Sequence, residues 1–146
     1  MWVLGNGESR QQVNVKNLKG IKIGCNAIIR DYKVDHLICV DRRMVEEAIG
    51  YNTKIYTRKD WLSTYKNFNV MHVPDLVHQG KERWDEPFHW GSGPYAVLLA
   101  TFLSKYIKSI DLLLCSSSNR TILTSKYYKD SLQIKNSIFT ESLYHA

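Results

Sequence analysis

The residues best suited to chemistry form a glycine-rich turn near the start of the chain, Gly5-Asn6-Gly7-Glu8-Ser9. The turn directly follows the apolar segment 2–4, which is typical of a short strand. Because glycine has no Cβ atom, backbone N–H groups in such a turn can converge on an anion, as they do in phosphate sites. The sequence therefore predicts that Gly5, Asn6, Gly7 and Ser9 bind a ligand. The alternative is a tight turn between a strand and a helix, with a glycine at positive φ and Ser9 as the helix cap.

Polar side chains also follow the next two apolar segments of the chain. Asn26 comes directly after segment 21–25, and Asp41 directly after segment 36–40. If these segments are parallel strands, Asn6, Asn26 and Asp41 line one crevice at the carboxyl edge of the sheet. Asp41 is then a candidate catalytic residue that holds a ribose, an acceptor or a metal. Each side chain is also a common cap or turn former, which leaves a structural role open.

A second candidate anion site is Gly91-Ser92-Gly93, which opens the clearest helical segment, 94–107. The dipole and the free N–H groups of a helix N-terminus favour a phosphate or a carboxylate there. His89, two residues upstream, is the histidine best placed to act as a general base, although most loop histidines have no such role. A structural turn is the alternative for the glycines.

The connection 75–93 is long, charged and aromatic, with Trp84, Phe88 and Trp90. Long connections without secondary structure of their own are usually functional or disordered, and aromatic residues argue against disorder. We interpret this segment as a lid that closes over the ligand crevice.

Short apolar segments alternate with helical ones along the chain, which predicts an α/β fold. The expected architecture is an open, doubly wound, mostly parallel sheet between two layers of helices, Rossmann-like and three-layered. Its strands are expected at 2–4, 21–25, 36–40, 54–57, 69–73 and 110–115, and its helices at 43–51, 59–66 and 94–107. In the last helix, Ala96, Leu99, Ala100 and Leu103 share one face, which we expect to pack on the sheet. Residues 116–146 are compatible with a helix, a last strand or a docked tail.

Length and composition favour one domain over residues 1–146. A chain of 146 residues with 44% apolar residues can bury a single core. Its apolar runs are far shorter than the roughly 18 residues of a membrane span, and the first residues lack the basic region of a secretory signal, so we expect a cytoplasmic protein. Three widely spaced cysteines, Cys25, Cys39 and Cys115, are typical of reduced core thiols rather than of disulfides or a zinc site.

A formal net charge of +6 favours anionic partners. The basic residues are dispersed, so this charge supports nucleic-acid binding only weakly. A nucleic-acid binder would use Trp84, Trp90 and Tyr95 to stack on bases.

Four short motifs together resemble a known group of nucleotide-dependent transferases. They are Gly-Asn-Gly-x-Ser at 5–9, Cys-Asn-Ala at 25–27, Val-Asp at 40–41 and Gly-Ser-Gly-Pro-Tyr at 91–95. The set resembles bacterial sialyltransferases, which carry Gly-Asn-Gly-Pro-Ser and Cys-Asn motifs and a late Ser-Gly-Val-Tyr helix start. It is also similar to archaeal pterin pyrophosphokinase-like proteins and to small bacteriophage proteins of unknown activity.

The resemblance implies a nucleotide or nucleotide-sugar as substrate and assigns residues to it. By resemblance, Asn6, Gly7, Ser9 and Asn26 contact the donor, and the 91–93 turn lies near its base or sugar. The motif departs from the family at Glu8, where the usual residue is proline. Its negative charge would repel a phosphate unless a divalent cation or Arg10 offsets it. The chain also departs after residue 115, where the family has a longer acceptor region with a histidine base.

The resulting hypothesis is a nucleotide-dependent, glycosyltransferase-like enzyme of bacteriophage type. In it, His89 and Asp41 are the candidate catalytic residues. One alternative is a non-catalytic protein that binds a nucleotide or a partner, which Glu8 and the short C-terminal region favour. Another is a pterin pyrophosphokinase-like enzyme. The sequence alone specifies no oligomeric state.

Overall fold

The computed structural model of the chain describes residues 1–74, 91–104, 112–114 and 137–138. Several expectations fall outside these residues. They are most of the 75–93 lid with Trp84, Phe88, His89 and Trp90, the thiol of Cys115, and the 116–146 segment except for its short strand.

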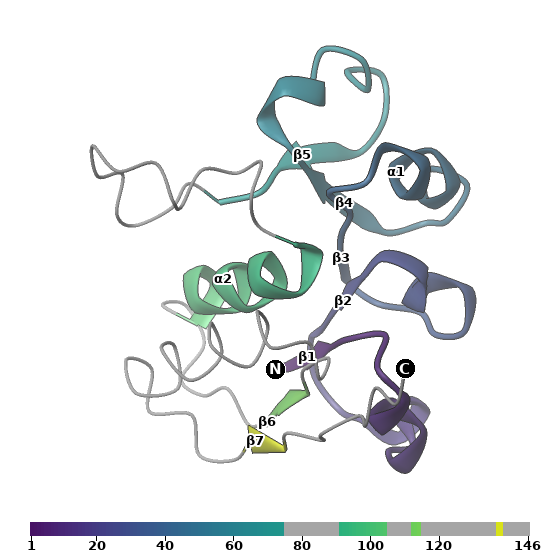
Figure 1. Cartoon of the computed structure of the whole chain (residues 1–146), viewed down its shortest axis with the longest axis vertical. Helices are drawn as coiled ribbons and strands as arrows, with labels where there is room; N and C mark the ends of the chain where they lie inside the picture. The colour runs from purple at the N-terminus through teal and green to yellow at the C-terminus, as the bar shows by residue number, and fades with distance from the viewer. Residues whose placement is uncertain (75–90, 105–111, 115–136, 139–146) are drawn as a thin grey trace, which may run out of the picture.

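A parallel sheet forms the middle of the molecule (Figure 1). Its spatial order is β5-β4-β3-β2-β1-β6-β7, and every pairing between neighbours is parallel. The strands are β1 (Trp2–Leu4), β2 (Lys22–Cys25), β3 (His36–Ile38), β4 (Lys54–Thr57), β5 (Val70–His72), β6 (Leu112–Leu114) and β7 (Ser137–Ile138). The six strands expected from apolar runs are all present, and β7 supplies a strand within the C-terminal segment. The predicted α/β, Rossmann-like fold is confirmed.

The strand order reverses at β1. From β1 to β5 each strand is added next to the previous one, whereas β6 returns to pair with the other side of β1. Such a reversal is the topological switch point at which ligands bind in open α/β sheets, beyond the carboxyl ends of the strands.

Helices cover both faces of the sheet. Figure 1 shows α2 (Ser92–Ser104) on one face and α1 (Arg42–Ala48) with the 3₁₀ helix η3 (Asn26–Arg30) on the other. Two further 3₁₀ helices, η1 (Glu8–Gln12) and η2 (Val15–Asn17), connect β1 to β2. Two buried apolar clusters, one on each face, form the core. The arrangement has the three layers that the sequence predicts.

The expectation that α2 packs on the sheet is confirmed, because Ala96, Leu99 and Ala100 share a buried cluster with residues of β1, β2 and β3, but the burial of the helix extends beyond that face. Tyr95, Val97 and Leu98 are buried as fully as Ala96 and Ala100, on all sides of the helix. A helix that is apolar all round is typical of a core element rather than a surface one. The spacings of three and four residues between Ala96, Leu99 and Ala100 identified the face that meets the sheet, and the structure adds that Tyr95, Val97 and Leu98 are buried as well.

The helix expected at 59–66 is wrong. The segment begins with a short 3₁₀ helix, η4 (Lys59–Trp61), and continues as turns in which Thr64 and Tyr65 donate to residues three positions back. Ser63, Thr64 and Asn67 are poor helix formers, because such side chains compete for backbone hydrogen bonds. The side chain of Tyr65 nevertheless enters the core at 4% exposure.

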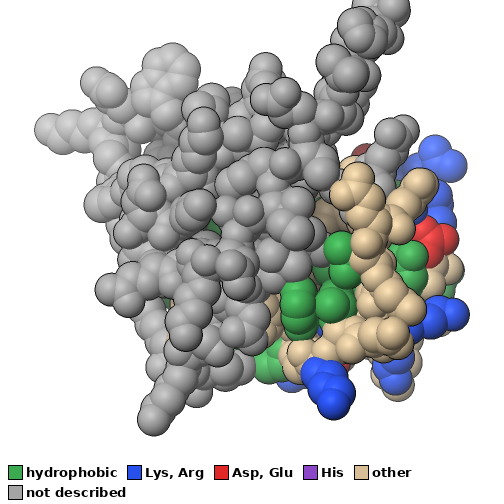
Figure 2. All heavy atoms as spheres, turned by 90° about the horizontal axis from the view of Figure 1, so that it is seen from below, with side chains coloured by type: hydrophobic (Ala, Val, Ile, Leu, Met, Phe, Trp, Pro, Cys, Tyr) green, Lys and Arg blue, Asp and Glu red, His purple; other side chains and the backbone are tan. Residues whose placement is uncertain are grey.

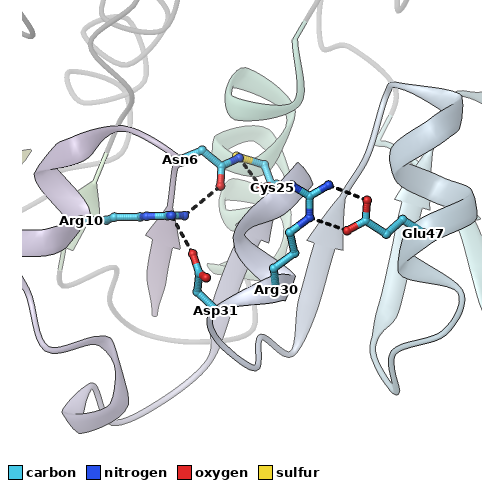
Figure 3. Close-up of polar contacts among 6 residues, drawn as sticks. All are labelled: Asn6, Arg10, Cys25, Arg30, Asp31 and Glu47. Carbon is cyan, nitrogen blue, oxygen red and sulfur yellow. Dashed lines mark hydrogen bonds and ion pairs between the residues drawn. The ribbon is translucent and has the colours of Figure 1, made fainter.

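Gly24 allows η3 to lie directly on the sheet. A Cβ atom on Gly24 would be 2.5 Å from Cγ2 of Ile28 and 3.0 Å from Cγ1 of Val34. Both neighbours are buried and β-branched, so neither side chain can swing away easily. From this position η3 reaches α1, where the Arg30 guanidinium pairs with both carboxylate oxygens of Glu47 at 2.5 and 2.6 Å (Figure 3).

Candidate functional site

The carboxyl edge of the sheet brings the predicted polar residues to one side of the molecule. Asn6, Asn26 and Asp41 each follow a strand, and those strands, β1 to β3, are neighbours and parallel. The glycine-rich turn follows β1, which is the strand at the switch point. The glycine-rich turn that the sequence predicts to bind a ligand thus lies where open α/β sheets bind their ligands.

The side chain of Asn6 ties the first turn to the second strand. Its Nδ2 donates to the carbonyl oxygen of Cys25 at 2.7 Å, and its Oδ1 accepts from Arg10 at 3.2 Å. The guanidinium of Arg10 also pairs with Asp31 at 2.6 Å (Figure 3). Arg10 therefore places a cation beside the turn, and Asp31 offsets part of its charge. Sequence reasoning had named Arg10 only as a counter-charge for Glu8; its spacing of four residues from Asn6 was the available signal.

The turn does not use positive φ at its glycines. Gly7 has φ −65° and ψ 157°, a conformation that any residue adopts, and it is Gly7 that immediately precedes η1. Within the described residues, positive φ occurs at Asn26 and Gly20. The alternative in which a turn glycine needs positive φ and Ser9 caps a helix is therefore wrong, because Ser9 lies inside η1.

Ser92 links the start of α2 to two strands. Its Oγ donates to Oδ1 of Asn26 at 2.8 Å and accepts from the backbone N–H of Val40 at 3.2 Å. Ser92 is 4% exposed, so these bonds form inside the protein. Asn26 meets Ser92 from a left-handed backbone conformation, φ 49°, which asparagine tolerates better than most residues. The two predicted ligand residues are thereby joined to each other.

The N-terminus of α2 opens at this edge. The helix begins where the Tyr95 N–H donates to the carbonyl of Gly91 at 3.4 Å. The N–H groups of Ser92 and Gly93 precede that first bond and have no partner within the helix, and Pro94 has no N–H. Gly91 is exposed and Gly93 is partly buried. An anion at this position would meet backbone donors and the positive end of a thirteen-residue helix.

Asp41 is a helix cap. Its Oδ1 accepts from the Arg43 N–H at 2.9 Å, at the start of α1. The structural alternative therefore applies to this carboxylate, although it stands exposed at the same edge as the asparagines. Among the residues that the structure describes, no group of three His, Cys, Asp or Glu side chains is arranged to hold a metal ion.

Two cysteines lie in the core beneath this edge. Cys25 and Cys39 are buried and not disulfide-bonded, as the sequence predicts for both. Burial raises the pKa of the Cys39 thiol to about 12, against the opposing effect of a hydrogen bond from the Asn26 backbone. A thiol with this pKa is a core group and not a nucleophile at neutral pH.

Tyr95 is unavailable for base stacking, because it is fully buried against the sheet. The prediction that it stacks on a nucleic acid is wrong. The burial of Tyr95 follows from the position of α2 inside the core.

Neither a protein-family model, a curated protein nor a solved structure shows significant similarity to this chain. Its class therefore follows from the fold: a doubly wound α/β domain of Rossmann-like architecture with a polar network at the carboxyl edge. In the described part of the chain, no helix has the length and apolarity to cross a bilayer.

Proposed function

We propose that this chain binds a nucleotide-containing small molecule at the carboxyl edge of its sheet and uses it in a glycosyltransferase-like reaction. The observation that carries the proposal is the position of the Gly5-Asn6-Gly7 turn, which follows β1 at the switch point of the sheet. Ligands of open α/β sheets bind at this place because the strand connections diverge there to opposite faces.

The phosphate groups of the ligand face the N-terminus of α2. The Ser92 and Gly93 N–H groups supply the donors, and the helix dipole favours the negative charge. The Ser92–Asn26 hydrogen bond holds the helix start against β2. Arg10, fixed by Asn6 and Asp31, adds a cation on the β1 side.

The transferase chemistry rests on the resemblance to sialyltransferase-like enzymes. In such a reaction the protein positions the donor and stabilises the leaving phosphate. His89 is the proposed base, and Asn6, Gly7, Ser9 and Asn26 are the proposed donor contacts. A pterin pyrophosphokinase-like reaction would use the same edge for a nucleoside triphosphate.

A non-catalytic binding protein is the second candidate, and specific observations favour it. The carboxylate of Asp41 caps α1, and the side-chain amides of Asn6 and Asn26 are hydrogen-bonded to other groups of the protein. These groups already form hydrogen bonds within the protein in the absence of a ligand. Such a protein would still bind the anion, because the proposed donors are backbone N–H groups at the start of α2.

The proposed anion site can be tested by a matched pair of substitutions, Gly91→Asp and Gly91→Asn. Among the described residues, a Cβ atom at Gly91 meets only Pro94 at 3.9 Å, an ordinary contact, and both Asp and Asn are good helix caps. We expect Gly91→Asp to weaken nucleotide binding about tenfold or more, since like charges about 4 Å apart repel by roughly 1–4 kcal/mol near a protein surface. Gly91→Asn should bind like the wild type.

The ligand is first found by a thermal-shift screen with CMP, UDP, GDP, ATP and their sugar conjugates, because a ligand of the native state raises its stability. Isothermal titration then compares the two variants. Equal affinities of Gly91→Asp and Gly91→Asn would refute phosphate binding at α2. Release of the sugar or diphosphate from a bound donor by the wild type, lost in His89→Ala with binding retained, separates the transferase from the binding protein.

A further inference from the structure

Two hollows open at the amino edge of the sheet, opposite the candidate site. The aromatic hollow has a volume of about 310 Å³ and is formed by the segments that lead into β4 and β5. It is lined by Ile49, Gly50, Tyr51, Asn52, Thr53, Ile55, Phe68 and Asn69. The lysine hollow, of about 350 Å³, is formed by the segments that lead into β2 and β3. It is lined by Val15, Lys16, Lys22, Asp31, Tyr32, Lys33 and Asp35.

The aromatic hollow exposes two ring side chains beside two carboxamides. Tyr51 is 41% and Phe68 51% exposed, which is high for large apolar side chains among the described residues. Asn52 and Asn69 are exposed, and their side-chain amides make no hydrogen bond within the described residues. Rings offer stacking surfaces, and carboxamides carry both a donor and an acceptor for the edge of a planar base.

The lysine hollow carries positive charge that is not paired with any described acidic side chain. Across the described residues, neither Lys16, Lys22 nor Lys33 forms an ion pair. Of the two acidic residues, Asp31 pairs with Arg10, and Asp35 accepts the backbone N–H of Lys22 at 2.8 Å. Figure 2, seen from below Figure 1, shows Lys and Arg side chains standing apart along the outside of the described part, with fewer acidic ones in view.

The two hollows are neighbours along the edge. Thr53, which lines the aromatic hollow, donates its hydroxyl to the carbonyl of Val34 at 2.8 Å. Val34 lies between Lys33 and Asp35, which line the lysine hollow. A stacking surface and a cationic surface are therefore joined by one buried hydrogen bond.

We propose that the amino edge binds single-stranded nucleic acid, with a base against Tyr51 and Phe68 and the phosphate backbone along Lys16, Lys22 and Lys33. Proteins that bind single strands combine aromatic platforms with a positively charged track in this way. The site is separate from the proposed nucleotide site, which lies at the other edge of the sheet.

The aromatic hollow favours nucleic acid over an acidic peptide. Lysines alone would bind a nucleic acid and an acidic peptide equally well. The exposed rings match the faces of bases, and the carboxamides of Asn52 and Asn69, which make no hydrogen bond within the described residues, match their edges. An acidic peptide would gain little from Phe68 or Asn69. The contribution of the rings to affinity therefore decides between these partners.

The stacking contribution is tested by fluorescence anisotropy with a fluorescein-labelled oligothymidine of about twelve nucleotides, within the usual footprint of single-strand binders. Phe68→Ala and Tyr51→Ala should each raise the Kd about tenfold, as removal of a stacked ring does elsewhere. Met71→Ala is the matched control, because Met71 is 38% exposed but lines neither hollow. Its Kd should match the wild type.

The charge contribution is tested by the salt dependence of the same Kd. Each lysine that contacts a phosphate contributes about 0.7 to the slope of log K against log salt for a single strand. Lys16→Gln and Lys33→Gln should each flatten the slope by about that amount. Lys59→Gln, an exposed lysine following β4 at the opposite edge, should leave it unchanged.

Undetectable oligothymidine binding, or binding that Phe68→Ala and Tyr51→Ala leave intact, would overturn the proposal. If polyglutamate displaces the oligothymidine equally well from the wild type, Phe68→Ala and Tyr51→Ala, the edge is a surface for acidic polymers instead. Gly91→Asp should not change oligothymidine binding, and Phe68→Ala should not change mononucleotide binding. Failure at one edge is therefore distinguishable from failure at the other.

Discussion

The two edges of the sheet use their polar groups in opposite ways. At the carboxyl edge, Asn6, Asn26 and Ser92 are bonded to the protein itself, and Ser92 is buried. At the amino edge, Asn52 and Lys33 are exposed and make no polar contact within the described residues. One edge is organised internally, and the other presents its side chains outward.

This difference predicts two kinds of recognition. At the carboxyl edge, the proposed ligand donors are backbone N–H groups that the internal bonds would hold in place, which suits a small anion of defined shape. At the amino edge, recognition depends on long side chains and exposed rings, which suits a flexible polyanion and depends strongly on salt. The substitutions below test this contrast, beginning with one that affects both edges.

Gly24→Ala should have the largest effect, because η3 runs from Asn26 at one edge to the lysine hollow at the other. The added methyl would be 2.5 Å from Ile28 in a packed core, so we expect a loss of about 3 kcal/mol in the free energy of unfolding. Urea denaturation measures it. Gly50→Ala is the control, since within the described part of the chain its Cβ meets only the Glu47 carbonyl at 3.7 Å; it should change stability by about 0.5 kcal/mol or less. Equal stability of the two variants would mean that η3 does not rest on the sheet.

Asn26→Ala should loosen the carboxyl edge alone. The variant loses the hydrogen bond with Ser92 and places alanine at φ 49°, so we expect about 2 kcal/mol of destabilisation. Asn26→Gly loses the same bond but tolerates the backbone, and it should be less destabilised in the same urea experiment. Nucleotide affinity should fall in both variants, while oligothymidine affinity stays unchanged. A glycine variant as unstable as the alanine variant would show that backbone conformation contributes nothing.

The smallest effect concerns pH at the amino edge. His36 begins β3, and its Nδ1 lies 3.0 Å from the Tyr56 hydroxyl. Burial lowers the pKa of His36, as does the nearby charge of Lys54, against the opposing charge of Asp35. The folded state therefore binds the proton less well than the unfolded state. Stability should be full above the unfolded pKa of about 6.5 and fall as the pH drops through the lower folded value.

The difference in urea midpoint between the wild type and His36→Gln isolates this contribution from those of the other histidines. The wild type should lose more stability than the variant between about pH 7 and pH 5, where unperturbed histidine titrates. If the urea midpoints of the wild type and His36→Gln change with pH in parallel, His36 does not cause the pH dependence of stability. The Cys39 thiol, with a pKa raised to about 12, should add no pH dependence in this range.

Local sequence pattern was sufficient for the strands and for the edge at which polar residues collect. Segments 2–4 and 54–57 form strands with the expected bounds. Because every strand is parallel, whatever follows a strand must lie at the carboxyl edge, so the common position of Asn6, Asn26 and Asp41 follows from order along the chain. Pattern failed at 59–66, where a segment of helical composition formed a short 3₁₀ helix and turns. At α2 it predicted correctly that the helix packs on the sheet, but it did not reveal that the other sides of the helix are buried too.

Tertiary structure alone decided which of these polar groups meet. The Ser92–Asn26 bond joins residues 66 positions apart, and no local pattern could have paired them. The close contact that leaves no room for a Cβ atom at Gly24, the left-handed backbone of Asn26 and the two hollows likewise arise from packing between segments of the chain. Hydrophobic periodicity reports how one segment meets its surroundings, whereas a site is made where several segments converge. The sequence therefore determined the strands and their carboxyl edge, and packing determined which side chains are bonded there and which remain exposed at the opposite edge.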